Sequence, residues 1–197
     1  GLLLLWPHVR VDHGGGLSAG PSDASLVLSC PSRGTPPPLA VSPERLGSAS
    51  GIDLDPMNLE SEADRRWLQA LVWPEHSERR ARLLTAIAAA RRAGIAVRHG
   101  DAIAEMPSLL DALPPGEAAC VFHAFTFNQI PAAPAARFVA ALEAASRHRP
   151  VFRLAYEWGA GETPELMLTA FEDGAAQPPR RLATAEAHGR WIAWESD

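Results

Sequence analysis

The sequence predicts a doubly wound α/β fold, in which a mostly parallel sheet carries helices on both faces. From residue 51 onward, short apolar segments of strand length alternate with longer segments of helical period. One of the apolar segments, AACVFHAF at 118–125, is nearly continuous, as expected for a strand whose two faces are both covered. Strands that alternate with helices form parallel sheets through right-handed crossovers, which leads to this fold class.

The expected elements can be placed in order along the chain. Strands are expected at GIDL (51–54), IAVR (95–98), AACVFHAF (118–125) and VFRLAY (151–156). Helices are expected at 61–72, at about 77–93, at about 103–112 and from Pro134 onward. Pro74 separates the first two helices and Gly94 ends the second. Segments 166–171 and 190–194 are expected to form an antiparallel edge of the sheet.

The first fifty residues have a different composition. Residues 12–50 are rich in Gly, Pro and Ser and contain one apolar run, LVLSC at 26–30, so we expect an insertion with a single short strand. The whole chain, 1–197, is expected to form one domain, because its length suits one core of ordinary size. The four Leu after Gly1 are too few for a signal peptide or a membrane span. Because Gly1 is not a start methionine and the apolar run is followed at once by Trp6-Pro7, we expect a domain that is truncated at its N-terminus.

Composition narrows the classes of partner. The formal net charge is −5, so no global basic field attracts nucleic acid or an anionic membrane. The two cysteines, Cys30 and Cys120, are far apart, which predicts no disulfide framework. None of the seven His stands in H-x-x-x-H or H-E-x-x-H spacing, which predicts no metal site. We expect a cytoplasmic protein whose partner is a small-molecule ligand.

The segment VDHGGGLSAG, at 11–20, contains two motifs typical of serine hydrolases. HGGG resembles the oxyanion-hole loop of lipases, and GLSAG fits the G-x-S-x-G pattern of a nucleophile elbow. The elbow needs a strand before its Ser and a helix after it, whereas Ser18 has loop-like residues on both sides. The two motifs also share Gly16, although the loop and the elbow occupy different places in that fold. We interpret the segment as a glycine-rich loop.

Carboxylates follow two of the expected strands. Asp53 lies at the end of GIDL with Asp55 two residues later, and Asp101 follows IAVR within the run HGDA. In an open α/β sheet, ligands bind outside the carboxyl ends of the strands, and the two oxygens of a carboxylate there can accept from both hydroxyls of a ribose. The structural alternatives stay open: Asp55-Pro56 begins a turn and caps the next helix, and Asp101 caps the helix that starts near Ile103.

Two more polar residues lie near the carboxyl ends of expected strands. His123, inside AACVFHAF, is a candidate catalytic base, and the alternative is a buried histidine whose hydrogen bonds are satisfied. Glu157 directly follows VFRLAY and is a candidate substrate contact, with capping or ion pairing as the alternative.

A family resemblance adds a cofactor class. GIDLDP, WLQALVWPEHSERRARL (67–83), HGDA (99–102) and HGRWIAW (188–194) together resemble the bacterial family called domain of unknown function 2332, over essentially the whole chain. The resemblance implies a Rossmann fold like that of class I methyltransferases and S-adenosylmethionine as cofactor. Gly100, Asp101 and Ala102 would then line the adenine, and Asp53 or Asp55 would bind the ribose. Gly1 resembles the end of the glycine loop that holds the methionine part of the cofactor.

Two functions therefore remain in view. The first is binding of S-adenosylmethionine by a methyltransferase-like protein, in which the carboxylates at successive strand ends hold the nucleoside. The alternative is a non-catalytic binding or assembly domain of Rossmann type. It is favoured by the absence of any residue that can be assigned to a methyl acceptor. The family resemblance supplies no reaction that would decide between them.

We predict that Ser18 does not react with a fluorophosphonate probe, because no base and no oxyanion hole are expected around it. The measurement is mass spectrometry of the peptide that contains Ser18 after incubation of the folded protein with the probe. Labelling of Ser18 would restore the hydrolase interpretation.

Overall fold

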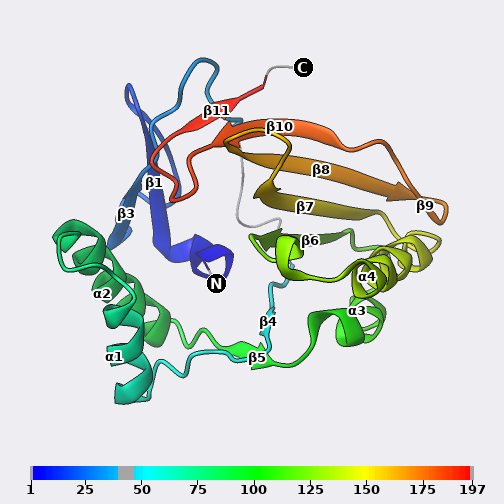
Figure 1. Ribbon diagram of the computed structural model, residues 1–197, viewed down its shortest axis with the longest axis horizontal. Helices are drawn as coiled ribbons and strands as arrows, with labels where there is room; N and C mark the ends of the chain where they lie inside the picture. Colours follow the sequence, from blue (N-terminus) through cyan, green and yellow to red (C-terminus); the bar gives the residue numbers. More distant parts are fainter. Residues whose placement is uncertain (1, 40–46, 196–197) are drawn as a thin grey trace. The chain divides into compact units, whose positions relative to one another are not determined.

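The computed structural model describes residues 2–39 and 47–195 (Figure 1). The chain divides into two compact units, the first formed by residues 1–30 and 38–100 and the second by residues 31–37 and 101–197. Each unit is described by itself. The expectation of one domain over 1–197 with an insertion at 12–50 stays a prediction. Within the described ranges, none of the helices is long and apolar enough to cross a bilayer.

The first unit begins with a three-stranded sheet. A 3-10 helix, η1 (Leu2–His8), leads into β1 (Val9–Gly14), which pairs antiparallel with β2 (Leu17–Ala19) and parallel with β3 (Leu26–Ser29). The strand expected within LVLSC is thus confirmed as β3, whereas β1 and β2 were not expected.

The motif HGGG forms the turn of the hairpin between β1 and β2. Gly14, Gly15 and Gly16 have φ angles of 80°, 60° and 83°, which favour glycine because it has no Cβ to clash. Ser18 is exposed in β2 and lies opposite Asp12, so it does not occupy a turn between a strand and a helix. The segment is therefore a β-hairpin and not the expected loop, whereas the interpretation that Ser18 does not stand in a nucleophile elbow agrees with this geometry.

A second, smaller sheet in the first unit joins β4 (Gly51–Asp53) and β5 (Val97–His99) in parallel. Between them lie α1 (Glu62–Ala70) and α2 (Ser77–Arg92). Ser61 caps α1, Pro74 lies between the helices, and Gly94, with a φ of 64°, follows the end of α2. The two helices, their separation at Pro74 and the parallel pairing of these strands are confirmed.

The core of the first unit joins η1, β1, β3 and α2. Its buried side chains are Leu5, Val9, Leu26, Ala89 and Ala90. Helix α2 contributes only alanines to this group, so its backbone can approach the sheet closely there, and Ile87 is a further buried residue of the helix.

The second unit is built on one larger sheet. Its strands are β6 (Ala119–Ala124), β7 (Val151–Trp158), β8 (Pro164–Glu172), β9 (Ala175–Ala176), β10 (Arg180–Ala185) and β11 (Ile192–Trp194). They run in the order β11-β10-β8-β7-β6, and β9 pairs with β8. The helices are α3 (Ala102–Asp111) and α4 (Ala132–Ala145). A short 3-10 helix, η3 (Phe127–Gln129), follows β6.

The predicted doubly wound, mostly parallel fold is wrong. In the larger sheet only β6 and β7 are parallel, and the pairs β7–β8, β8–β10, β10–β11 and β8–β9 are all antiparallel. Strands β4 and β5 form a separate sheet instead of extending it. The described part of the chain therefore contains two helical crossovers between parallel strands, as the alternating pattern indicated, but they do not contribute to one sheet. The predicted layout of a class I methyltransferase is also wrong, because it requires a single, mostly parallel sheet.

Helices cover one face of the larger sheet. Ala119, Val151 and Phe171 are register neighbours on β6, β7 and β8, and all three are buried. Phe138 and Leu142 of α4 pack on them, and Met106 and Leu110 of α3 complete the core. Figure 1 shows α3 and α4 on the same side of this sheet. Phe122, whose side chain points to the other face of β6, is 40% exposed.

We predict that Phe171→Ala lowers the free energy of unfolding by about 3–5 kcal/mol, because it opens a cavity beneath α4. Phe122→Ala, on the opposite face of the same sheet, should lower it by about 1 kcal/mol or less. Urea denaturation followed by tryptophan fluorescence measures both. Equal losses in the two variants would mean that the second face is as tightly packed as the first.

Candidate functional site

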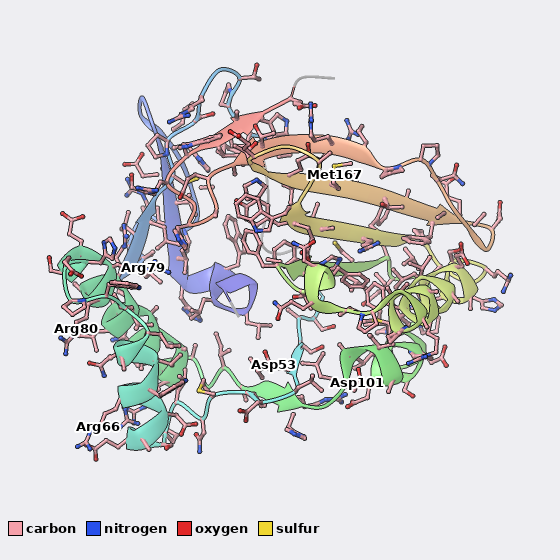
Figure 2. All side chains as sticks on the ribbon, in the orientation of Figure 1. Asp53, Arg66, Arg79, Arg80, Asp101 and Met167 are labelled. Atoms are coloured by element: carbon pink, nitrogen blue, oxygen red, sulfur yellow. The ribbon has the colours of Figure 1, made fainter. Side chains whose placement is uncertain are left out.

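Asp53 lies at the carboxyl end of β4, where the parallel neighbour β5 also ends (Figure 2). The backbone N–H of Gly100 donates to the carbonyl oxygen of Asp53 at 2.9 Å, which holds the two strand ends together. The N–H of Asp55 donates to Oδ1 of Asp53, also at 2.9 Å, and this bond closes a turn. Within residues 2–39 and 47–195, Oδ2 of Asp53 accepts no hydrogen bond, and the side chain is exposed.

His99 is the register partner of Asp53 across the parallel pair. Register partners point to the same face of a sheet, so the imidazole and the carboxylate share one face at the strand ends. Both residues are exposed. The sequence assigned no role to His99, although it stands next to the Gly100-Asp101 segment that was singled out.

The structural alternatives for the other carboxylates have different outcomes. Asp55 does not cap the next helix, because Ser61 is the N-cap of α1, but Asp55 does take part in the turn with Asp53. Asp101 is the N-cap of α3, and its Oδ1 accepts from the N–H of Ile103 at 2.9 Å. Ala102 is the first residue of that helix.

The predicted cofactor residues do not all lie in one unit. Asp53, Asp55 and Gly100 belong to the first unit, whereas Asp101 and Ala102 belong to the second. Gly1 lies outside the described residues. The nucleoside roles of all six residues therefore stay predictions. Among them, Asp53 is the residue at the shared carboxyl end of two parallel strands.

In the second unit, His123 and Glu157 contact each other. They lie on the neighbouring parallel strands β6 and β7, and 2.7 Å separates Nδ1 of His123 from Oε1 of Glu157. The two side chains are only 8% and 13% exposed. On the other side of the ring, Nε of Arg153 donates to Nε2 of His123 at 2.9 Å. Because Nε2 accepts this bond, His123 is neutral and its Nδ1–H donates to Glu157.

Both ring nitrogens of His123 are therefore engaged in hydrogen bonds within the protein. A general base needs a free nitrogen within reach of the proton that it takes. The geometry thus agrees with the structural alternative of a buried, hydrogen-bonded histidine. The catalytic role of His123 stays a prediction.

A strained turn after β6 supplies further donors to Glu157. Phe125 has a φ of 50°, a conformation that costs a bulky residue of the order of 1–3 kcal/mol. The chain direction changes there, and the N–H groups of Thr126 and Phe127 donate to Oε1 of Glu157 at 2.9 and 3.1 Å. Oε2 of Glu157 is buried and has no hydrogen-bond partner in the described part of the chain.

Aromatic rings enclose the polar network. The ring of Phe127 lies 4.3 Å from the His123 ring and 4.8 Å from the ring of Phe138, centroid to centroid. The guanidinium carbon of Arg153 lies 4.3 Å from the centroid of Phe127 and 5.7 Å from that of Phe138. Arg153 is therefore held by one hydrogen bond and two cation–π contacts.

Burial and hydrogen bonding determine the charge state of this network. Burial lowers the pKa of His123, and the nearby Arg153 acts in the same direction, against the opposing effect of Glu157. Burial alone would raise the pKa of Glu157, but the N–H groups of Phe127 and Thr126 and the His123 ring together hold that pKa below its usual value. Burial also lowers the pKa of Arg153, which nevertheless stays a cation.

A cavity in the first unit lies apart from the predicted cofactor residues. The first unit has an open cavity of about 400 Å³, lined by His8, Pro21, Asp23, Ala24, Ser25, Ala89, Arg92 and Ala93. None of the candidate cofactor residues lines it. Across 2–39 and 47–195, no group of three or more His, Cys, Asp or Glu side chains is arranged to hold a metal ion.

Residues 1–194 match a protein family described as an uncharacterized protein conserved in bacteria (DUF2332). The chain belongs to this family. The family resemblance noted in the sequence is thereby confirmed, whereas the methyltransferase-like Rossmann fold inferred from it is not. No curated protein and no solved structure matches this DUF2332 chain.

Arg153 is central to the polar network of this DUF2332 protein, although no role was predicted for it. One signal was available. Arg153 stands inside an apolar strand, on the same face as Val151 and Ala155, and a cation in such a position needs a partner. Glu157 lies on that face too, since it follows Arg153 by an even number of residues.

We predict that the DUF2332 chain loses stability as the pH falls from 7.5 to 5.5, and that His123→Gln reduces this loss. The folded state depresses the pKa of His123, so its contribution is complete above about pH 6.5 and is lost as the pH falls toward the lowered pKa. Urea denaturation at the two pH values gives the free energies of unfolding.

The control for this prediction is His148→Gln, at an exposed histidine three residues beyond the end of α4. This variant should keep the loss of stability seen in the wild type. If His123→Gln shows the same loss as the wild type, the burial of a neutral His123 does not contribute to the pH dependence.

Proposed function

We propose that this DUF2332 protein binds S-adenosylmethionine, and that Asp53 holds the ribose of the ligand. The observation that carries the proposal is the position of the Asp53 carboxylate, exposed at the shared carboxyl end of two parallel strands. In open α/β sheets, ligands bind outside the carboxyl ends of parallel strands, and Asp53 stands at such an end in the β4–β5 pair.

The hydrogen bonding of Asp53 supports a ribose contact. Its Oδ1 already accepts the N–H of Asp55, which fixes the orientation of the carboxylate. A carboxylate can accept about four hydrogen bonds, so Oδ1 has one further site and Oδ2 has both of its sites free for the two ribose hydroxyls. His99, on the same face, supplies a flat ring against which the ligand can pack.

Asp101 is not part of the proposed site, because it belongs to the second unit and its Oδ1 accepts the N–H of Ile103 as the cap of α3. Binding alone is proposed, because both nitrogens of the candidate base His123 are engaged. Binding without methyl transfer is also what a non-catalytic domain would do, and an assay for transfer of labelled methyl groups separates the two.

We predict that Asp53→Ala weakens the binding of S-adenosylmethionine and S-adenosylhomocysteine by about 10- to 100-fold, since charge-assisted hydrogen bonds to the diol are lost. Asp53→Asn should be intermediate, because the amide keeps one acceptor but loses the charge. Isothermal titration calorimetry measures all affinities. Glu75→Ala is the control, since Glu75 is an exposed carboxylate between α1 and α2 of the same unit.

The outcomes separate the ligand from the residue. If the wild type binds neither compound at millimolar concentration, the proposed function is wrong. If it binds both and Asp53→Ala binds equally well, the ligand is retained but Asp53 is not part of the site. If adenosine binds as tightly as S-adenosylmethionine, the site recognises the nucleoside and makes no use of the methionine part.

A further inference from the structure

We propose that Arg153 anchors a binding site for an oxyanion, the carboxylate or phosphate group of a small ligand, in the second unit. The proposal does not depend on the nucleoside site at Asp53. It rests on the guanidinium group of Arg153. The protein holds this group at Nε and leaves the terminal nitrogens Nη1 and Nη2 without hydrogen-bond partners among the described residues.

The held edge is defined by three contacts. Nε of Arg153 donates to Nε2 of His123, and the guanidinium carbon lies over the ring of Phe127 and near that of Phe138. His123 is fixed in turn by Glu157, through the 2.7 Å contact at its other nitrogen. The orientation of the guanidinium plane is therefore determined before any ligand arrives, which reduces the entropy lost on binding.

The other edge is open. A guanidinium group has five N–H donors, and His123 takes the one on Nε. In the part of the chain that the structure describes, the terminal nitrogens Nη1 and Nη2 form no hydrogen bond or ion pair, although Arg153 is partly buried. Glu157 forms no hydrogen bond with them in these described residues: its Oε1 accepts from His123, Thr126 and Phe127, and its Oε2 has no hydrogen-bond partner.

The chemistry of the open edge fits an oxyanion. Nη1 and Nη2 present parallel N–H groups whose spacing matches the two oxygens of a carboxylate or phosphate. The charge of Glu157 favours the cationic form of Arg153, but the hydrogen bonds of Glu157 go to His123, Thr126 and Phe127 and leave Nη1 and Nη2 of Arg153 for a ligand. The rings of Phe127 and Phe138 exclude water from part of the site, which strengthens an ionic hydrogen bond there.

Thr169 adds a second donor for the same ligand. It is the register neighbour of Arg153 on β8, so its side chain points to the same face of the sheet. Opposite side chains in an antiparallel pair lie about 4.5–5.5 Å apart at Cβ. A hydroxyl at that position can donate to an oxyanion that Arg153 binds.

The test is a thermal denaturation series in phosphate, acetate and chloride at constant ionic strength. We expect phosphate or acetate to raise the midpoint of the wild type above its value in chloride, and Arg153→Gln to lose most of this rise. The affinity derived from the series should fall about tenfold or more in Arg153→Gln. The rise in Arg153→Lys should be intermediate, because lysine keeps the positive charge but lacks the two parallel N–H groups of the guanidinium.

Controls separate binding at this site from the general effect of salts. Phosphate stabilises most proteins by exclusion from their surface, and that part of the rise should be the same in Arg153→Gln and in Arg137→Gln, at an exposed position of α4. Arg137→Gln should keep the full rise of the wild type. A rise that is identical in the wild type and Arg153→Gln would overturn the proposal. A rise with phosphate alone would restrict the ligand to phosphate compounds.

A measurement on the wild type covers the case in which Arg153→Gln does not fold. Phenylglyoxal modifies accessible guanidinium groups at their terminal nitrogens, and mass spectrometry locates the modified residues. Phosphate or acetate should protect Arg153 and leave Arg137 reactive. If Arg153 reacts equally with and without the anions, or does not react at all, its open edge is not a binding site.

Discussion

The carboxylate of Glu157 joins the carboxyl end of β6 to β7, and the local structure of the second unit depends on it. One oxygen accepts from the backbone N–H groups of Thr126 and Phe127 and from the ring of His123. Hydrogen bonds to a charged group contribute about 1.5–3 kcal/mol each when shielded from water, which is comparable with the cost of about 1–3 kcal/mol for the strained φ of Phe125. The turn, the histidine and the strand pairing therefore stabilise one another.

The same carboxylate organises the polar groups across the sheet. A neutral His123 donates to Glu157 and accepts from Arg153, so the orientation of the carboxylate determines that of the guanidinium. Glu157, His123 and Arg153 all lie on strands β6 and β7. The rings of Phe127 and Phe138 pack against the guanidinium group. Groups supported in this way move little when a ligand binds, which is the usual condition for a precise site.

Asp53 in the first unit is positioned by different means. Its carboxylate is fixed by a turn to Asp55, and its strand by a single neighbour, β5. The strands of this pair have only three residues each, whereas β7 and β8 have eight and nine. Binding at Asp53 would thus order the strand ends as well as the ligand, and part of the interaction energy would be used for that ordering.

The length of the connections explains why the larger sheet is mainly antiparallel. Parallel neighbours need a crossover of a dozen or more residues, and α4 provides one between β6 and β7. After Trp158 only residues 159–163 precede β8, which is enough for a hairpin and too short for a crossover. The sheet therefore continues antiparallel through β8, β10 and β11, and helices remain on one face.

Local elements and their ends could be predicted from the sequence. The break at Pro74 and the end of α2 at Gly94 follow from short-range sterics and hydrogen bonding, and the parallel pairing across each helical crossover follows from the length of the connection. Only the tertiary structure decided that β4 and β5 do not join β6, because pairing between distant strands depends on which faces become buried. The role of Arg153 also became clear only in the folded protein. From the sequence, a cation in an apolar strand indicates that some partner is needed, and the structure identifies that partner as His123.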